Sequence, residues 1–245
     1  MLYESIDIEG VAVCDQSFDF GCYHSFFGTA VETRGLEVLP LFDEACQEKW
    51  GGAYLPCQHG IGHGVLVFVK EENLLDALNL CETISWQPIG GCSSGVFMEY
   101  NFRTMETALS RKSYVRLIGE EDDVHAPCST LPSHFQVSCY FEMPQWWEQL
   151  YGGNYEKIGM LCSEIGDAEL KKTCFQGAGN YAAPFAQFDV RGIRELCDTM
   201  PGEGKIFCRE GASWILLGKG EEKENVRELC VGLLPSLKQA CQKNI

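Results

Sequence analysis

The chain has 245 residues, of which 45% are hydrophobic and 22% are charged, a composition typical of a globular protein with a substantial core. Its formal net charge is −16. An acidic surface disfavours nucleic acid and anionic membranes as partners, but it is compatible with a cationic peptide, a metal ion or simple solubility. No run of 18 apolar residues occurs, so we expect no membrane span.

The cysteines predict a repeat protein. They form couples whose members lie 11 residues apart, or 12 in one case, after a first couple with closer spacing. From the couple of Cys46 onward, successive couples recur at steps of 33 to 35 residues, apart from one step of 47. A fixed period in this range is the signature of a repeat array. The couples are Cys14 and Cys22, Cys46 and Cys57, Cys81 and Cys92, Cys128 and Cys139, Cys162 and Cys174, Cys197 and Cys208, and Cys230 and Cys241.

The segments that precede the first cysteine of a couple have helical periodicity. In 74–81, 158–162, 193–197 and 226–230, apolar residues recur at i, i+3 and i+4 up to the cysteine. A short segment that often holds Gly or Pro follows, and these residues are turn signals. We expect the second cysteine of each couple to open another helix. Each unit is therefore predicted to be an αα-hairpin whose two cysteines flank the turn.

This placement predicts seven disulfides. Cysteines that flank a helix–turn–helix can reach the Cα separation of roughly 4.4–6.8 Å that a disulfide needs. Pairing within couples is the simplest of many connectivities, and each bridge is worth on the order of 3 kcal/mol. Seven disulfides indicate an extracytoplasmic protein, periplasmic or secreted. Because residues 1–5 lack the features of a signal peptide, either a leader has been removed, the chain comes from a longer precursor, or the compartment differs.

Glycine recurs three residues after the second cysteine of four couples, at Gly60, Gly95, Gly177 and Gly211. Glycine inside a helix costs about 1 kcal/mol relative to Ala. Its repetition at one register predicts a close approach of neighbouring helices, where no Cβ fits. The alternative is that these residues are loop glycines that precede a later helix start.

In period and cysteine placement, nearly the whole chain resembles the Sel1-like branch of the tetratricopeptide superfamily, and in particular the cysteine-rich secreted repeat proteins of Helicobacter. The resemblance implies an all-α superhelix of about seven αα-hairpins of ~35 residues with one disulfide each, and a tendency to bind a peptide or protein. The Gly-Val-x-x-Asp-x-x-Lys-Ala run typical of Sel1 repeats is absent. The resemblance therefore assigns no individual site residue.

The array is expected to extend over 1–245 as one domain. Additional residues between Cys92 and Cys128 fall around 111–127. They form an insertion at which the array could divide into 1–110 and 125–245.

Two positions of the second helix in each unit form a candidate ladder. Two residues after the second cysteine stand His24, His59, Ser94, Phe141, Gln176 and Glu210, and six residues after it stand Gly28, His63, Met98, Gln145, Asn180 and Trp214. These positions are i and i+4 and share one helix face. We expect Gln176, Asn180 and Glu210 to line a groove. In the adjacent Trp146 and Trp147, at least one indole is expected to be partly exposed as a binding anchor.

The first three units hold a candidate metal site. His59 and His63 have the i, i+4 spacing with which two imidazoles bind one ion. His24 and Glu99 would complete a set for zinc, copper or iron. Histidines hydrogen-bonded inside a helical stack are the structural alternative.

Three functional hypotheses remain open: an extracytoplasmic module that binds a peptide or protein, a metal-binding protein or metalloenzyme, and a structural scaffold. The sequence holds no His-Glu-x-x-His, no Gly-x-Ser-x-Gly and no Cys-x-x-Cys motif. Because no catalytic residue can be named, a protein without enzymatic activity is favoured over an enzyme.

Overall fold

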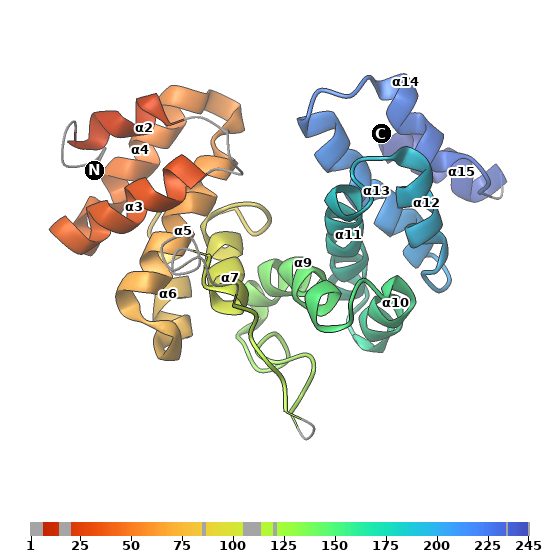
Figure 1. Ribbon diagram of the computed structural model, residues 1–245, viewed down its shortest axis with the longest axis horizontal. Coiled ribbons are helices and arrows are strands. Elements are labelled where there is room, and N and C mark those ends of the chain that lie inside the picture. Colours follow the sequence, from red (N-terminus) through yellow and green to blue (C-terminus); the bar gives the residue numbers. More distant parts are fainter. Residues whose placement is uncertain are drawn as a thin grey trace. The chain divides into compact units, whose positions relative to one another are not determined.

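The computed structural model describes residues 7–14, 21–84, 87–104, 114–119, 122–233 and 235–244. The described residues form an all-α fold without strands, as predicted (Figure 1). The helices in chain order are η1 (Asp7–Glu9), α2 (Gly10–Val13), α3 (Gly21–Arg34), η2 (Leu36–Val38), α4 (Leu39–Trp50), η3 (Gly51–Ala53), α5 (Leu55–Val69), η4 (Glu71–Asn73), α6 (Leu74–Cys81), α7 (Cys92–Phe102), α9 (Ser133–Leu150), α10 (Tyr155–Glu164), α11 (Ala168–Phe185), α12 (Val190–Asp198), α13 (Gly204–Gly218), α14 (Lys223–Val226), η5 (Arg227–Cys230) and α15 (Pro235–Asn244).

All fourteen cysteines pair within their couples, which confirms the predicted connectivity. The Cα–Cα separations run from 5.4 to 5.8 Å. We call the helices that carry the second cysteine of a couple the B-helices; they are α3, α5, α7, α9, α11, α13 and α15. The seven disulfides make an oxidising, extracytoplasmic compartment the natural setting of the chain.

The starts of the B-helices differ in part from the prediction. Cys92 is the first residue of α7, as expected, but α9, α11 and α13 all begin before their cysteine. The start of α11 is set by Asp167, whose side chain accepts hydrogen bonds from the backbone N–H groups of Glu169 and Leu170. A side-chain oxygen at this position satisfies amides that a helix start leaves unpaired. Helix α11 therefore begins where Asp167 caps it, and not at Cys174.

By its internal contacts the chain divides into two compact units, 1–139 and 140–245, with the boundary inside α9. This boundary lies beyond the insertion, and the break expected at 111–127 remains a prediction.

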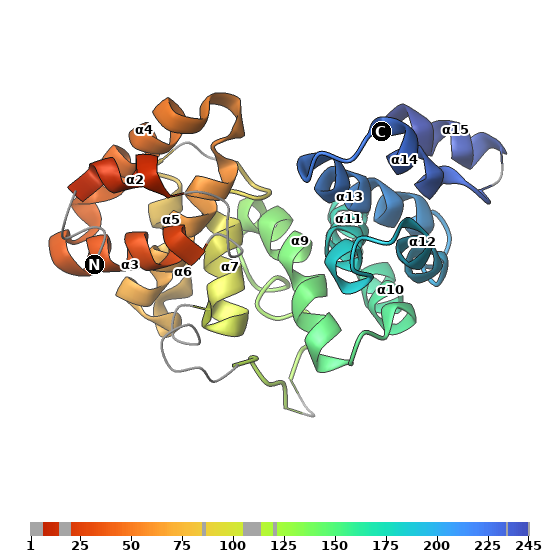
Figure 2. The same cartoon turned by 45° about the horizontal axis from the view of Figure 1, so that its top comes forward.

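In the first unit, α5 packs between α3 and α7 (Figures 1 and 2). Phe27 and Phe42 are fully buried, and their rings meet edge to face at 4.9 Å between centroids. Ile61 and Phe97 continue this core along α5 and α7. Burial of such side chains contributes about 1.5–3 kcal/mol each.

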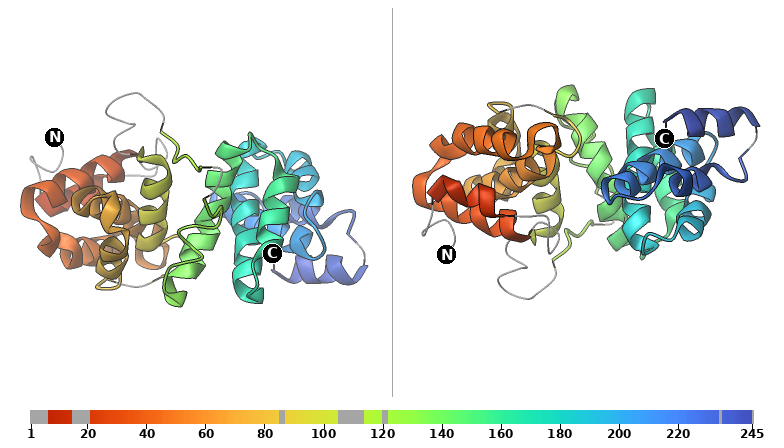
Figure 3. Two further views of the ribbon diagram at one scale, coloured as in Figure 1. Left: turned by 90° about the horizontal axis from the view of Figure 1, so that it is seen from below. Right: turned by 90° about the horizontal axis from the view of Figure 1, so that it is seen from above.

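In the second unit, α11 packs against α13, and both contact α12 (Figures 2 and 3). Helix α10 lies against α11, and α15 against α13. The core includes Ile158 and Ile193, both fully buried. Each disulfide joins a B-helix to the segment that precedes it in the chain.

Neighbouring B-helices touch through their backbones at glycine. An ideal Cβ would lie 1.9 Å from the backbone oxygen of His59 if built at Gly95, 2.1 Å from that of Phe141 at Gly177, and 1.8 Å from that of Gln176 at Gly211. No Cβ fits at such distances, so the close approach predicted for these three glycines is confirmed. Small residues allow this kind of backbone contact between helices.

A second set of glycines, two residues further along the register, makes the corresponding contact in the opposite direction. A Cβ at Gly62 would lie 1.9 Å from the backbone oxygen of Cys92, and one at Gly179 would lie 1.7 Å from that of Cys208. Each of these helix pairs is therefore closed by two glycines, one from each helix. The reciprocal register fixes how one B-helix is aligned with the next.

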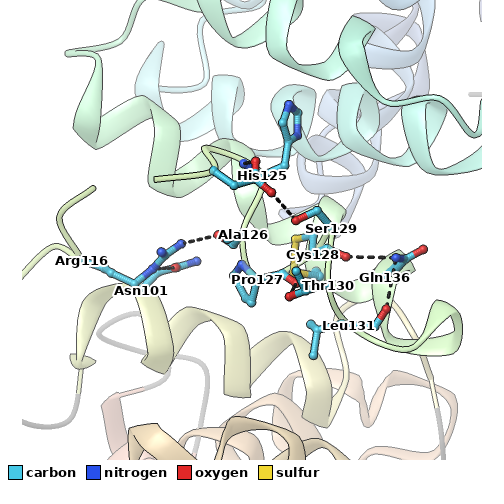
Figure 4. Close-up of a disulfide and its surroundings, with 12 residues drawn as sticks. Asn101, Arg116, His125, Ala126, Pro127, Cys128, Ser129, Thr130, Leu131 and Gln136 are labelled. Atoms are coloured by element: carbon cyan, nitrogen blue, oxygen red, sulfur yellow. Dashed lines mark hydrogen bonds between the residues drawn. A yellow bond between two sulfur atoms is a disulfide. The ribbon is translucent and has the colours of Figure 1, made fainter. Parts of the chain in front are cut away.

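In the fourth repeat, the described residues directly before Cys128 form no helix. Residues 124–130 form turns, so the prediction of an αα-hairpin is wrong for this unit. Arg116 organises the segment, because its guanidinium donates to Asn101 Oδ1 and to the backbone oxygen of Ala126, both at 3.0 Å (Figure 4). The disulfide between Cys128 and Cys139 anchors the turns to α9.

Among the helices that the structure describes, none has the length and apolar character needed to cross a membrane.

Candidate functional site

In the first unit, the packing of α5 on α7 brings His63 of α5 against Glu99 of α7. His63 Nδ1 lies 2.8 Å from Glu99 Oε2 and also 2.8 Å from Thr104 Oγ1. The Thr104 hydroxyl donates to Glu99 Oε2 at 2.5 Å. His63 is 0% exposed and Glu99 3% exposed, and burial lowers the pKa of His63 to about 3. The imidazole is therefore neutral at physiological pH, with its Nδ1–H directed at the carboxylate.

This cluster lacks the geometry of a nucleophile relay. In a hydroxyl–imidazole–carboxylate triad, the hydroxyl and the carboxylate contact different ring nitrogens. Here Thr104 and Glu99 both contact Nδ1, and the hydroxyl proton is directed at Glu99. The three side chains contact one another, and both His63 and Thr104 direct a donor at the buried carboxylate of Glu99.

The predicted metal ligands come together only in part. The rings of His59 and His63 lie 5.0 Å apart between centroids. Glu99 was expected as a ligand, but it contacts Nδ1 of His63. This is the position of a carboxylate that orients a histidine ligand. The side chain of His24 lies outside the described residues. Within the described part of the chain, no group of three or more His, Cys, Asp or Glu side chains could hold a metal ion.

In the second unit, the glycine contacts align three i, i+4 pairs on neighbouring B-helices. The pairs are Phe141 and Gln145 on α9, Gln176 and Asn180 on α11, and Glu210 and Trp214 on α13; we call these six residues the second-unit B-face. Phe141 and Trp214 belong to α9 and α13, yet their rings stack at 6.3 Å between centroids with an interplanar angle of 23°.

The second-unit B-face is only partly covered. Phe141, Gln176 and Glu210 are 4%, 6% and 9% exposed, whereas Trp214 is 37% exposed. Gln145 and Asn180 are half-buried. The face therefore presents one aromatic ring and several amide and carboxylate groups beside it.

Two hydrogen-bond acceptors on this face have no partner among the described residues. They are the buried atoms Glu210 Oε2 and Gln145 Oε1. A buried acceptor that lacks a hydrogen bond costs roughly 1–3 kcal/mol, so native proteins rarely leave one. Each of the two atoms keeps the capacity to accept a hydrogen bond from a donor that reaches it.

The other buried carboxylates of the second unit are satisfied internally. Glu142 accepts a hydrogen bond from the Tyr181 hydroxyl, and Glu148 accepts one from Tyr155. Burial, together with these carboxylates, raises the pKa of both tyrosine hydroxyls well above the usual value. Each phenol therefore stays protonated and keeps donating, which sets these two carboxylates apart from Glu210.

The expectation of a partly exposed tryptophan in 146–147 is wrong. Trp146 and Trp147 are both 0% exposed. The contact of α9 with its surroundings buries two adjacent positions of the helix, so neither indole is available as a surface anchor. The exposed indole of the unit belongs to Trp214, which the ladder register had placed beside Glu210.

Sequence reasoning missed Thr104 and the Phe141–Trp214 stack. Thr104 follows the end of α7, so the register of that helix did not include it. Phe141 and Trp214 occupy the two ladder positions, so the helix face that these positions share was the signal that could have predicted the stack.

No family model matches the chain, and neither the curated proteins nor the solved structures give a match.

Proposed function

We propose that the protein binds a peptide, or an extended segment of a protein partner, along the second-unit B-face. The observation that carries the proposal is the pair of unsatisfied buried acceptors, Glu210 Oε2 and Gln145 Oε1, beside the half-exposed ring of Trp214. Peptides supply hydrogen-bond donors at regular intervals, and indoles are frequent anchors in interfaces.

The resemblance to Sel1-like repeats supports the same function, because stacked αα-hairpins offer an extended surface to peptides and proteins. We place the protein in the periplasm or outside the cell, since its disulfides would be reduced in most cytosols. The rigid backbone contacts between α11 and α13 favour binding without rearrangement.

A peptide-display selection on the whole oxidised protein tests the proposal. We expect selected peptides to lose at least tenfold in affinity for Asn180→Arg, which fills the second-unit B-face. The matched control is Met160→Arg on α10, a helix that contributes none of those six residues, where Met160 is 58% exposed. Failure to select any peptide, or equal binding to the two variants, would overturn the proposal.

The geometry of His63 favours metal binding as a second candidate function. Because Nδ1 is directed at Glu99, the lone pair of the neutral imidazole is on Nε2, as in histidine ligands oriented by a carboxylate. His59 supplies a second imidazole on the same helix face. Elemental analysis of untagged, oxidised protein, with a free-thiol count, is the test. We expect one equivalent of zinc, copper or iron in the wild type and none in His59→Ala or His63→Ala; a metal-free wild type would exclude this function.

A further inference from the structure

Glu210 Oε2 is a buried acceptor without a hydrogen-bond donor among the described residues. The residue is 9% exposed, and the nearby hydroxyl of Ser213 donates to the backbone oxygen of Glu210, 2.6 Å away, instead of to the carboxylate. The neighbouring cation, Arg209, donates to the backbone oxygens of Leu229 and Val231 and to Asp198. Neither of these neighbours in sequence donates a hydrogen bond to Glu210 Oε2.

An aromatic surface lies one helical turn from this carboxylate. Trp214 follows Glu210 at i+4 on α13, and side chains at this spacing are neighbours on a helix surface. The ring of Trp214 stacks on Phe141, which holds the indole in place. Gln145, one turn from Phe141 on α9, contributes the second unsatisfied acceptor.

The group that matches these side chains is flat and cationic, and it carries several N–H donors. A guanidinium has all three properties: it stacks on indole, pairs with a carboxylate through two N–H groups, and retains further donors for an amide oxygen. An ammonium group is a compact, strongly hydrated donor that matches the stacked aromatic surface less well. The net charge of −16 also favours a cationic ligand.

We infer that Glu210, Trp214 and Gln145 form a subsite for an arginine side chain of the bound peptide. This inference rests on the proposed peptide-binding function and names the chemistry of one residue of the ligand. Glu210 pairs with the guanidinium, Trp214 covers its plane, and Gln145 accepts one of its remaining N–H groups.

The test is a titration of oxidised protein with Nα-acetyl-arginine amide, followed by the NMR signal of the Trp214 indole N–H. The comparison ligands are Nα-acetyl-citrulline amide, a neutral isostere, and Nα-acetyl-lysine amide. We expect saturable binding of the arginine amide, at least tenfold weaker binding of the citrulline amide, and an intermediate or weaker affinity for the lysine amide. Equal binding of arginine and citrulline, or no saturable binding, would overturn the inference.

Variants locate the subsite. Glu210→Gln, which keeps the shape and removes the charge, should weaken binding of the arginine amide at least tenfold, whereas Glu195→Gln on the exposed surface of α12 should not change it. A wild-type affinity in Glu210→Gln would contradict the assignment. Circular dichroism and a disulfide count confirm that each variant folds.

The two proposals can fail separately. If selected peptides bind the second-unit B-face but the arginine amide does not, the subsite is wrong and the peptide-binding function stands. If the arginine amide binds through Glu210 but no peptide is selected, the proposed function fails while the guanidinium site remains.

Discussion

The backbone oxygen of Gln176 lies 1.8 Å from the position that a Cβ on Gly211 would occupy. The same relationship joins Gly177 to Phe141 and Gly95 to His59. Because the obstructing atom belongs to the backbone of a packed helix, no side-chain rotation can relieve a clash. The register of the B-helices therefore depends on these glycines.

We expect Gly211→Ala to destabilise the protein by about 1–3 kcal/mol, the usual cost of overpacking, and to lower Tm by several degrees. The control is Gly218→Ala at the end of the same helix, where no atom lies within 4 Å of an added Cβ. That change should leave the stability equal or raise it by up to about 1 kcal/mol, because Ala favours a helix. Thermal unfolding of the oxidised proteins measures both; a neutral Gly211→Ala would contradict the packing.

Removing one disulfide should have a measurable cost. Cys197 and Cys208 are both fully buried. We expect the double variant Cys197→Ala/Cys208→Ala to lose about 2–5 kcal/mol of unfolding free energy, since its unfolded chain is less constrained. Urea unfolding under oxidising conditions checks this, and an unchanged midpoint would show that the bridge contributes nothing.

His63 predicts an acid-sensitive stability. The folded state holds this imidazole neutral with a pKa of about 3, whereas the unfolded chain titrates near 6.5. The contribution of His63 is fully present above pH 6.5. It is lost progressively as the pH falls from there toward 3, because the unfolded state then binds the additional proton; the total is on the order of a few kcal/mol.

This pH dependence can be separated from that of the rest of the chain. We expect His63→Gln to unfold with a shallower loss of stability between pH 6.5 and 4 than the wild type does, since Gln does not titrate. Urea midpoints at several pH values give both slopes. Parallel slopes would show that His63 is not the responsible group.

Arg116 should control the order of the insertion. Its guanidinium donates to Asn101 and Ala126, and it lies over the ring of Tyr100 at 4.9 Å. Loss of these contacts in Arg116→Ala should raise the rate of limited proteolysis within 114–131 on the order of tenfold. Arg227→Ala, which removes an exposed ion pair with Glu224, is the control, and equal cleavage of the two variants would contradict the role of Arg116.

The sequence was most informative where the partners are fixed by a local period. Cys81 and Cys92 flank one turn, and Gly211 stands at a register that three other units share, so the disulfides and the close helix packing were predictable. Side-chain contacts between one repeat and the next were not predictable. Glu99 was expected as a metal ligand, but α7 places its carboxylate against His63 Nδ1. The burial of Trp146 and Trp147 depends on the elements that cover α9, which no spacing within the helix reveals.

The first cysteine of every couple is bonded to the next cysteine along the chain, and no bridge crosses another. When the chain is synthesised or exported with its N-terminus first, it can therefore complete each native disulfide before the next couple appears. An oxidase that joins cysteines in order of arrival would make the correct set without reshuffling. Oxidative maturation of this protein should accordingly need a thiol oxidase but no disulfide isomerase.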